Sequence, residues 1–103
     1  MSKSVTIVDY GIGNILSVAR ALEAVGASVN VTTTVEGIEN AQRLILPGVG
    51  AFAAGMTELK KNHLDIAIIN LAHSGVPLLG ICLGMQFLMD SSEEFGETAG
   101  LEV

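Results

Sequence analysis

The sequence predicts an α/β fold: a doubly wound, mostly parallel β-sheet with helices on both faces. Short, β-branched apolar runs alternate along the chain with stretches in which apolar residues recur at helical spacing. Half of the 103 residues are hydrophobic and only 4% are aromatic, so aliphatic side chains must form the core. An apolar share of this size also excludes intrinsic disorder.

The first strand and helix are predicted from residues 5–26. Val5–Val8 is a β-branched run that ends in the glycine-containing turn 9–13. Asn14 is a favourable N-cap, and Gly26 stands where a helix commonly ends. Between them one helical face carries five apolar residues: Ile15, Val18, Ala19, Leu22 and Val25.

The alternation continues along the rest of the chain. The following segments are expected in order: a strand at 28–33, a polar segment with one helical turn at 34–42, a buried strand at 44–46, a helical region at 53–72, a strand at 76–81 and a helical segment at 83–90. The region 53–72 is expected to break near Asn62 and His63, and Gly75 to end it. Residues 91–103 show no periodicity and read as an acidic segment without regular structure.

Charge and cysteine content exclude several classes of function. The net charge of −6 argues against a nucleic-acid partner and against an anionic membrane surface. The single cysteine excludes an internal disulfide and a cysteine-rich metal site, and an unpaired thiol is typical of a reducing compartment. No apolar run reaches the roughly 18 residues of a membrane span, and no signal-peptide core follows the N-terminus. We therefore expect a cytoplasmic protein without a metal site.

The most specific motif is Gly80-Ile81-Cys82-Leu83-Gly84, between a predicted strand and a predicted helix. This is the spacing of a nucleophile elbow, with cysteine as the nucleophile. The helix N-terminus favours the thiolate, and the backbone amide of Leu83 can donate to a developing oxyanion. The alternative is a small buried cysteine, which is common in apolar strands but leaves both glycines unexplained.

Two further glycine-containing loops are expected at the same edge, because sites in such sheets lie beyond the carboxyl ends of the strands. Pro47–Gly50 allows the backbone to approach a ligand and to supply a second oxyanion donor; an ordinary turn is the alternative. Gly11-Ile12-Gly13 resembles the start of a dinucleotide fingerprint. Leu16 occupies the position of its third glycine, and the second strand ends in threonines rather than an acidic residue, so that function is excluded.

No histidine is expected to serve Cys82 as a general base. His73 ends the helical region that leads into the fourth strand, so it belongs at the opposite end of the sheet from Cys82. His63, at the helix break, is expected on the outer layer. Gln86 stands one helical turn beyond Cys82 and is expected to face the same side.

These motifs are similar to those of a known family. Gly80–Gln86 resembles the nucleophile segment of class I (triad-type) glutamine amidotransferases, and Leu46–Phe52 resembles the oxyanion strand of one branch. Val8–Asn14, followed by Ser17–Val18, resembles the glutaminase subunits of imidazole glycerol phosphate synthases. The resemblance implies no cofactor and a flavodoxin-like sheet. In the flavodoxin-like strand order, 2-1-3-4, the strand at 78–81 lies last on one side.

The resemblance also implies a reaction. Cys82 would attack the side-chain amide of L-glutamine and form a γ-glutamyl thioester. The ammonia would pass to a partner, the (β/α)₈ cyclase subunit of a heterodimer in histidine biosynthesis. The implied roles of the other residues are an oxyanion hole from Val49, Gly50 and Leu83, glutamine binding by Gly50 and Gln86, and a partner interface at Asn14. In the resting state the peptide before Gly50 is expected to be poorly placed for an oxyanion.

One departure from the family concerns length. Its members are longer, and their catalytic His and Glu lie in the part that residues 1–103 do not match. We therefore expect these residues to be the N-terminal half of a single glutamine amidotransferase domain, truncated after the nucleophile helix and inactive alone. Two alternatives stay open: a flavodoxin-like binding module without catalysis, and the glutaminase of another amidotransferase, such as pyridoxal phosphate synthase. The segment Tyr10–Asn14 speaks against the latter.

Overall fold

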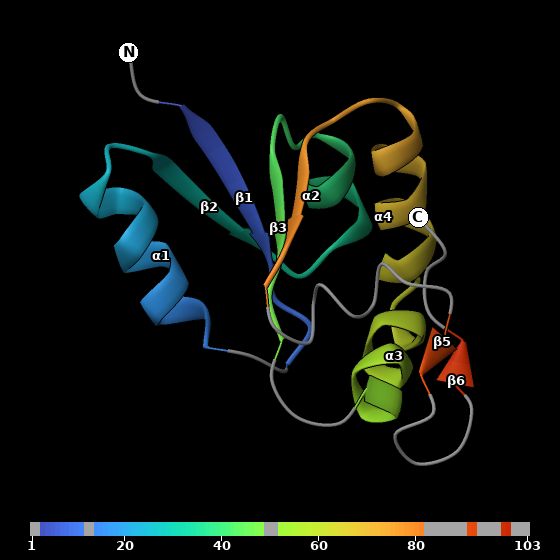
Figure 1. Cartoon of the computed structure of the whole chain (residues 1–103). Helices are drawn as coiled ribbons and strands as arrows, with labels where there is room; N and C mark the ends of the chain where they lie inside the picture. The colour runs from blue at the N-terminus through green and yellow to red at the C-terminus, as the bar shows by residue number, and fades with distance from the viewer. Residues whose placement is uncertain (1–2, 12–13, 49–51, 82–90, 93–97, 100–103) are drawn as a thin grey trace.

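The fold is a parallel sheet with helices on both faces, as a computed structural model of the chain shows (Figure 1). It describes residues 3–11, 14–48, 52–81, 91–92 and 98–99. The elements are β1 (Ser4–Val8), α1 (Ile15–Ala24), β2 (Ser28–Thr32), α2 (Val35–Glu39), β3 (Leu44–Leu46), α3 (Phe52–Lys61), α4 (Leu64–His73), β4 (Leu78–Gly80), β5 (Ser91–Ser92) and β6 (Thr98–Ala99). The four-stranded sheet has the order β2-β1-β3-β4, and its neighbouring strands are all parallel. The predicted fold class and strand order are confirmed.

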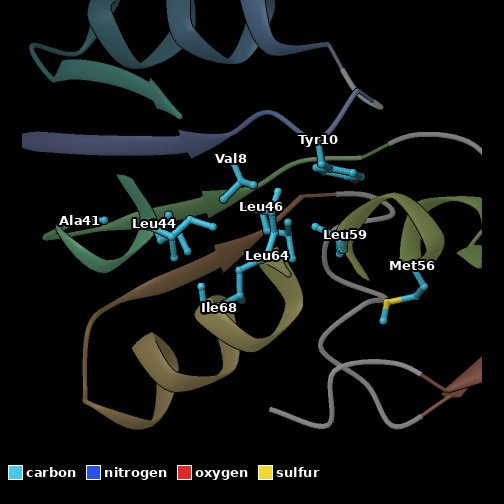
Figure 2. Close-up of a cluster of buried hydrophobic side chains, with 11 residues drawn as sticks. Val8, Tyr10, Ala41, Leu44, Leu46, Met56, Leu59, Leu64 and Ile68 are labelled. Atoms are coloured by element: carbon cyan, nitrogen blue, oxygen red, sulfur yellow. The ribbon is translucent and has the colours of Figure 1, made fainter. Parts of the chain in front are cut away.

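Two buried clusters lie on opposite faces of this sheet, because successive strand residues point to opposite sides. On one face β1 and β3 contribute Val8, Leu44 and Leu46, which join residues of α2, α3 and α4 (Figure 2). On the other face the same strands contribute Val5, Ile7 and Ile45, and α1 packs there through Ile15, Val18, Ala19 and Leu22. The helices thus cover both faces, with α1 alone on its side among the described helices.

The helix ends follow the local chemistry that the sequence indicated. The Asn14 side chain caps α1 by accepting a hydrogen bond from the Ser17 amide at 3.2 Å. Gly26 and Gly75, which follow α1 and α4, adopt φ angles of +91° and +94°. The long helical region breaks as predicted: α3 ends at Lys61, and His63 has a left-handed φ of 60°.

Two expectations were wrong. Val25 does not continue the buried face of α1, because the helix ends at Ala24 and Val25 is its C-cap, with 81% of its surface exposed. Within residues 91–103 the structure has an antiparallel pair, β5 with β6, where no regular structure was expected. Each of these strands has two residues, which is too short to produce a periodic signal. The helical segment expected at 83–90 lies outside the described residues.

The length and apolar character of the described helices decide whether one of them could span a membrane. None of those in the described ranges has both the length and the apolar character needed to cross a bilayer. The longest are α1, α3 and α4, with 10 residues each.

Candidate active site

The carboxyl ends of β1, β3 and β4 meet at one edge of the sheet (Figure 1). β1 and β3 are in register at Ile7 and Ile45, and β3 and β4 at Leu46 and Gly80. The amide of Ile81 donates to the Leu46 carbonyl at 3.0 Å, so the pairing of β3 with β4 continues to the last described residue of that segment. The loops that follow these strands therefore leave the sheet side by side, as the motifs required.

The predicted catalytic and binding residues themselves lie outside the described residues. These residues are Val49, Gly50, Cys82, Leu83 and Gln86. The expected resting orientation of the peptide before Gly50 also falls on residues outside the described ranges. The described neighbours Gly48 and Ile81 lead directly into them in the sequence. The roles of these residues remain predictions. The structure describes the paired strands β3 and β4 that precede them in the sequence.

A side chain that the motif reasoning did not single out links two of the three loops. Tyr10, two residues after β1, donates its phenol hydrogen to the carbonyl of Pro47, which follows β3. Tyr10 is 4% exposed, and burial raises the pKa of its hydroxyl above the ordinary value of 10.0. It is therefore a neutral hydrogen-bond donor at physiological pH. In the sequence, Tyr10 stands out as an aromatic residue in a glycine-containing loop and as part of the segment Val8–Asn14 that carries the family resemblance.

The loop that carries Tyr10 is fixed by its own hydrogen bonds. The Asp9 amide donates to the Thr32 carbonyl of β2 at 2.8 Å. The Asp9 carboxylate accepts from the Gly11 amide at 3.1 Å, which makes a local turn. Gly11 adopts a φ of +90°, a conformation that glycine reaches without strain. The backbone on both sides of Tyr10 thus has a defined direction.

Asn14 is exposed and its side-chain oxygen is engaged in capping α1. That local role explains the residue type without reference to a partner. An exposed position at the start of α1, next to the carboxyl edge of the sheet, is also compatible with the predicted interface. The interface role remains a prediction.

The two histidines lie at opposite ends of α4. His73 is the last residue of that helix, where the chain turns toward the start of β4, so it is remote from the carboxyl edge (Figure 1). His63 stands at the N-terminus of α4 and is exposed on the helical layer, without a side-chain capping bond. The expected placement of both residues agrees with the structure. Across the described ranges, no three His, Cys, Asp or Glu side chains gather as a metal site would require.

An apolar groove lies on the α1 face of the sheet, between that helix and β4. Its volume is about 320 Å³, and its apolar lining includes Val18, Leu22, Ile45, Leu79 and Ile81. Leu79 is 57% exposed there. The described elements leave this part of the sheet uncovered.

Comparison with known proteins adds the family context. The family model for class I glutamine amidotransferases matches residues 6–99. A HisH 1 subunit of imidazole glycerol phosphate synthase from Legionella pneumophila (strain Paris) is 54% identical over 100 residues, which are 97% of this chain and 47% of the relative. The HisH subunit from Moorella thermoacetica is 50% identical over 101 residues, 98% of this chain and 48% of the relative.

A third relative, the HisH subunit from Salinibacter ruber, is 48% identical over 98 residues, 95% of this chain and 45% of the relative. The chain thus spans about half the length of the curated relatives it matches. Among solved structures, a protein from Listeria monocytogenes EGD-e assigned to peptidase E superposes with a TM-score of 0.73 at 18% identity. That match covers 96% of this chain and 61% of the other, and it supports the fold alone.

Proposed function

Since this chain belongs to the class I glutamine amidotransferase family, we propose that it is part of a glutaminase, the ammonia-producing subunit of an imidazole glycerol phosphate synthase. The observation that carries the proposal is the similarity to HisH subunits: 54% identity across 97% of the chain. The three loops at the carboxyl edge, each following its own strand, support it independently.

In the proposed reaction the thiolate of Cys82 attacks the side-chain amide carbon of L-glutamine. The tetrahedral intermediate collapses with release of ammonia and leaves a γ-glutamyl thioester. Water then adds to the thioester, releasing glutamate and restoring the thiol. Cysteine suits this role because its thiolate is a strong nucleophile and the reaction is divided into two easier steps.

The proposed oxyanion donors are the Leu83 amide and an amide of the Val49–Gly50 segment. Both belong to chain segments that continue the adjacent, hydrogen-bonded strands β3 and β4. Backbone amides that donate to the developing oxyanion stabilise its negative charge, which is why such donors accelerate acyl transfer. Gly50 and Gln86 are proposed to hold the glutamine.

The general base is proposed to lie outside residues 1–103. The family's triad pairs the nucleophile with a His and a Glu, and neither described histidine fits. His73 is at the wrong end of α4, and His63 is exposed on the outer helical layer. Residues 1–103 alone should therefore have negligible glutaminase turnover, since loss of the base alone costs on the order of 10²–10⁴-fold.

The proposed partner is a cyclase subunit that consumes the ammonia, with Asn14 and its loop at the interface. Glutamine hydrolysis would then serve histidine biosynthesis. The acidic net charge of −6 within this chain is suited to a protein partner rather than to nucleic acid.

The test is glutamate and ammonia release by the full-length protein that contains this sequence, assayed with a cyclase subunit. We expect activity that depends on Cys82 and falls on the order of 10⁴-fold or more in Cys82→Ala. Cyclase binding by the variant serves as the control for folding. Ammonia release that survives Cys82→Ala, or none from the wild-type complex, would overturn the proposal. Robust turnover by residues 1–103 alone, abolished by His63→Ala, would instead assign the base to His63.

A further inference from the structure

We propose that Tyr10 is a positioning residue for the oxyanion segment: its hydroxyl holds the Pro47 carbonyl and so fixes the direction in which the chain leaves β3. This inference rests on the proposed glutaminase function. It adds a residue from the first loop to a site otherwise built from the second and third.

The carbonyls at the end of β3 point alternately toward its two neighbours. The Leu46 carbonyl accepts from Ile81 on the β4 side, at 3.0 Å. The next carbonyl, that of Pro47, accepts from the Tyr10 hydroxyl on the β1 side. Successive carbonyls of a strand face opposite directions, so the Tyr10 side chain continues the β1 side of the ladder beyond the strand end.

Among the described residues of the first loop, 9–11 and 14, the donor to this carbonyl is the Tyr10 side chain and not a backbone amide. At the end of β1, the Asp9 amide donates to Thr32 of β2, on the other side. Pro47 and Gly48 are both buried, and a buried carbonyl without a donor is unfavourable. The Tyr10 hydroxyl therefore supplies the hydrogen-bond donor that the Pro47 carbonyl needs. The position of this carbonyl in turn sets the direction of the chain as it leaves β3.

The helix that follows this segment in the sequence packs into the same cluster as Tyr10. Residues 49–51 lead in the sequence to α3, whose buried residues Met56 and Leu59 are 2% and 0% exposed. Both belong with Tyr10 to the larger core cluster (Figure 2). Tyr10 thus bonds to the start of the segment and shares a core with the helix at its end.

Oxyanion stabilisation is sensitive to such anchoring. An effective donor must lie about 2.7–3.1 Å from the developing oxyanion, and loss of one donor costs on the order of 10²–10³ in kcat. In the described part of the chain, the Tyr10 hydroxyl holds the carbonyl of Pro47, which precedes the segment. Loosening it should lower kcat while leaving ground-state glutamine binding largely intact.

The experiment compares Tyr10→Phe with wild type in the full-length protein bound to its cyclase subunit. Phenylalanine keeps the ring in the core and removes only the hydroxyl. We expect kcat for glutamine hydrolysis to fall about tenfold and KM to change less than about twofold. The rate of Cys82 alkylation by iodoacetamide should stay at the wild-type value, because that reaction needs no oxyanion hole.

Ile68→Val is the matched control. Ile68 lies in the same cluster, fully buried on α4, and its truncation also destabilises the core while leaving the Tyr10 hydroxyl in place. Its kcat should equal that of wild type. A wild-type kcat in Tyr10→Phe, or an equal fall in Ile68→Val, would overturn the positioning role.

Hydrogen exchange separates this inference from the proposed function. In Tyr10→Phe, amides of the peptide spanning 48–52 should exchange several-fold faster, whereas those of β2 should not change. Unchanged exchange at 48–52 would refute the anchor whatever the activity. If wild type releases no ammonia but the exchange difference appears, the glutaminase proposal fails and the anchoring by Tyr10 stands.

Discussion

At the residue scale, burial of the Tyr10 phenol couples the fold to pH. Burial raises the pKa of this hydroxyl above its ordinary value of 10.0, so the folded protein keeps the proton where the unfolded chain releases it. The stability from this difference is present in full below the unfolded pKa. It is lost as the pH rises from there through the folded pKa.

We expect the free energy of unfolding of wild type to fall more steeply above pH 10 than that of Tyr10→Phe, which has no phenol to ionise. Urea titrations from neutral pH to about one unit above the ordinary pKa measure the difference. In the full-length protein, the difference in phenolate absorbance between wild type and Tyr10→Phe reports the ionisation of this group, which is the only tyrosine among residues 1–103. Ionisation at the ordinary pKa in the folded protein would contradict the prediction.

Asn14 offers a residue-scale test that separates capping from partner binding. Asn14→Ala should destabilise the protein by about 0.5–2 kcal/mol, because the Ser17 amide loses its acceptor. Asn14→Ser keeps a capping oxygen and should retain most of that stability. If Asn14 also faces the cyclase subunit, both variants should bind the partner more weakly. If both variants bind the cyclase subunit with wild-type affinity, the role of Asn14 is limited to capping α1.

At the scale of elements, α2 approaches the end of β2 so closely that its middle residue must be glycine. A Cβ on Gly37 would stand 1.8 Å from the Thr32 hydroxyl oxygen and 2.5 Å from the Thr32 Cβ. The Thr32 side chain is in turn held by the start of α2, since its hydroxyl accepts from the Thr34 amide at 3.2 Å. Space rather than backbone conformation requires the glycine here.

Gly37→Ala should therefore destabilise the protein by about 1–3 kcal/mol, despite the better helix propensity of alanine. The exposed Glu39, in the same helix, provides the control: Glu39→Ala should change stability by less than about 0.5 kcal/mol. Denaturant midpoints of the two variants make the comparison. A Gly37→Ala variant as stable as wild type would mean that α2 and β2 lie farther apart than described.

Elements were predictable where local chemistry determines them. The continuous apolar runs indicated β1 and β3, and Gly26 and Gly75 marked the ends of α1 and α4. Val25 was misassigned because the apolar pattern runs one residue past the end of the helix. The Tyr10–Pro47 bond joins residues 37 positions apart, which no periodicity reveals. For the site, strand alternation predicted the shared edge of the three loops, whereas the placement of the reactive groups depends on residues outside the described ranges.

At the scale of the whole molecule, the sheet order leaves β4 at one edge, and the two edge strands differ in character. On the β2 side, Ser28 and Asn30 are polar, and the Asn30 amide bonds the Ser4 hydroxyl at 3.2 Å. The β4 side has the sequence Leu-Leu-Gly and continues with Ile81. Beside it lies the apolar groove against α1, of about 320 Å³. Exposed apolar edges without charges are the kind that pair with other chains.

We therefore expect residues 1–103, produced alone, to associate or aggregate rather than persist as a folded monomer. Sedimentation velocity at micromolar concentration measures this. Leu79, which is 57% exposed, is the residue to change: Leu79→Lys should shift the distribution toward monomer by placing a charge on the edge strand and in the groove. Val31, 50% exposed on β2, provides the matched control, and Val31→Lys should leave association unchanged. A stable monomer with cooperative unfolding would show that the β4 edge needs no partner, and equal effects of the two lysines would place the association elsewhere.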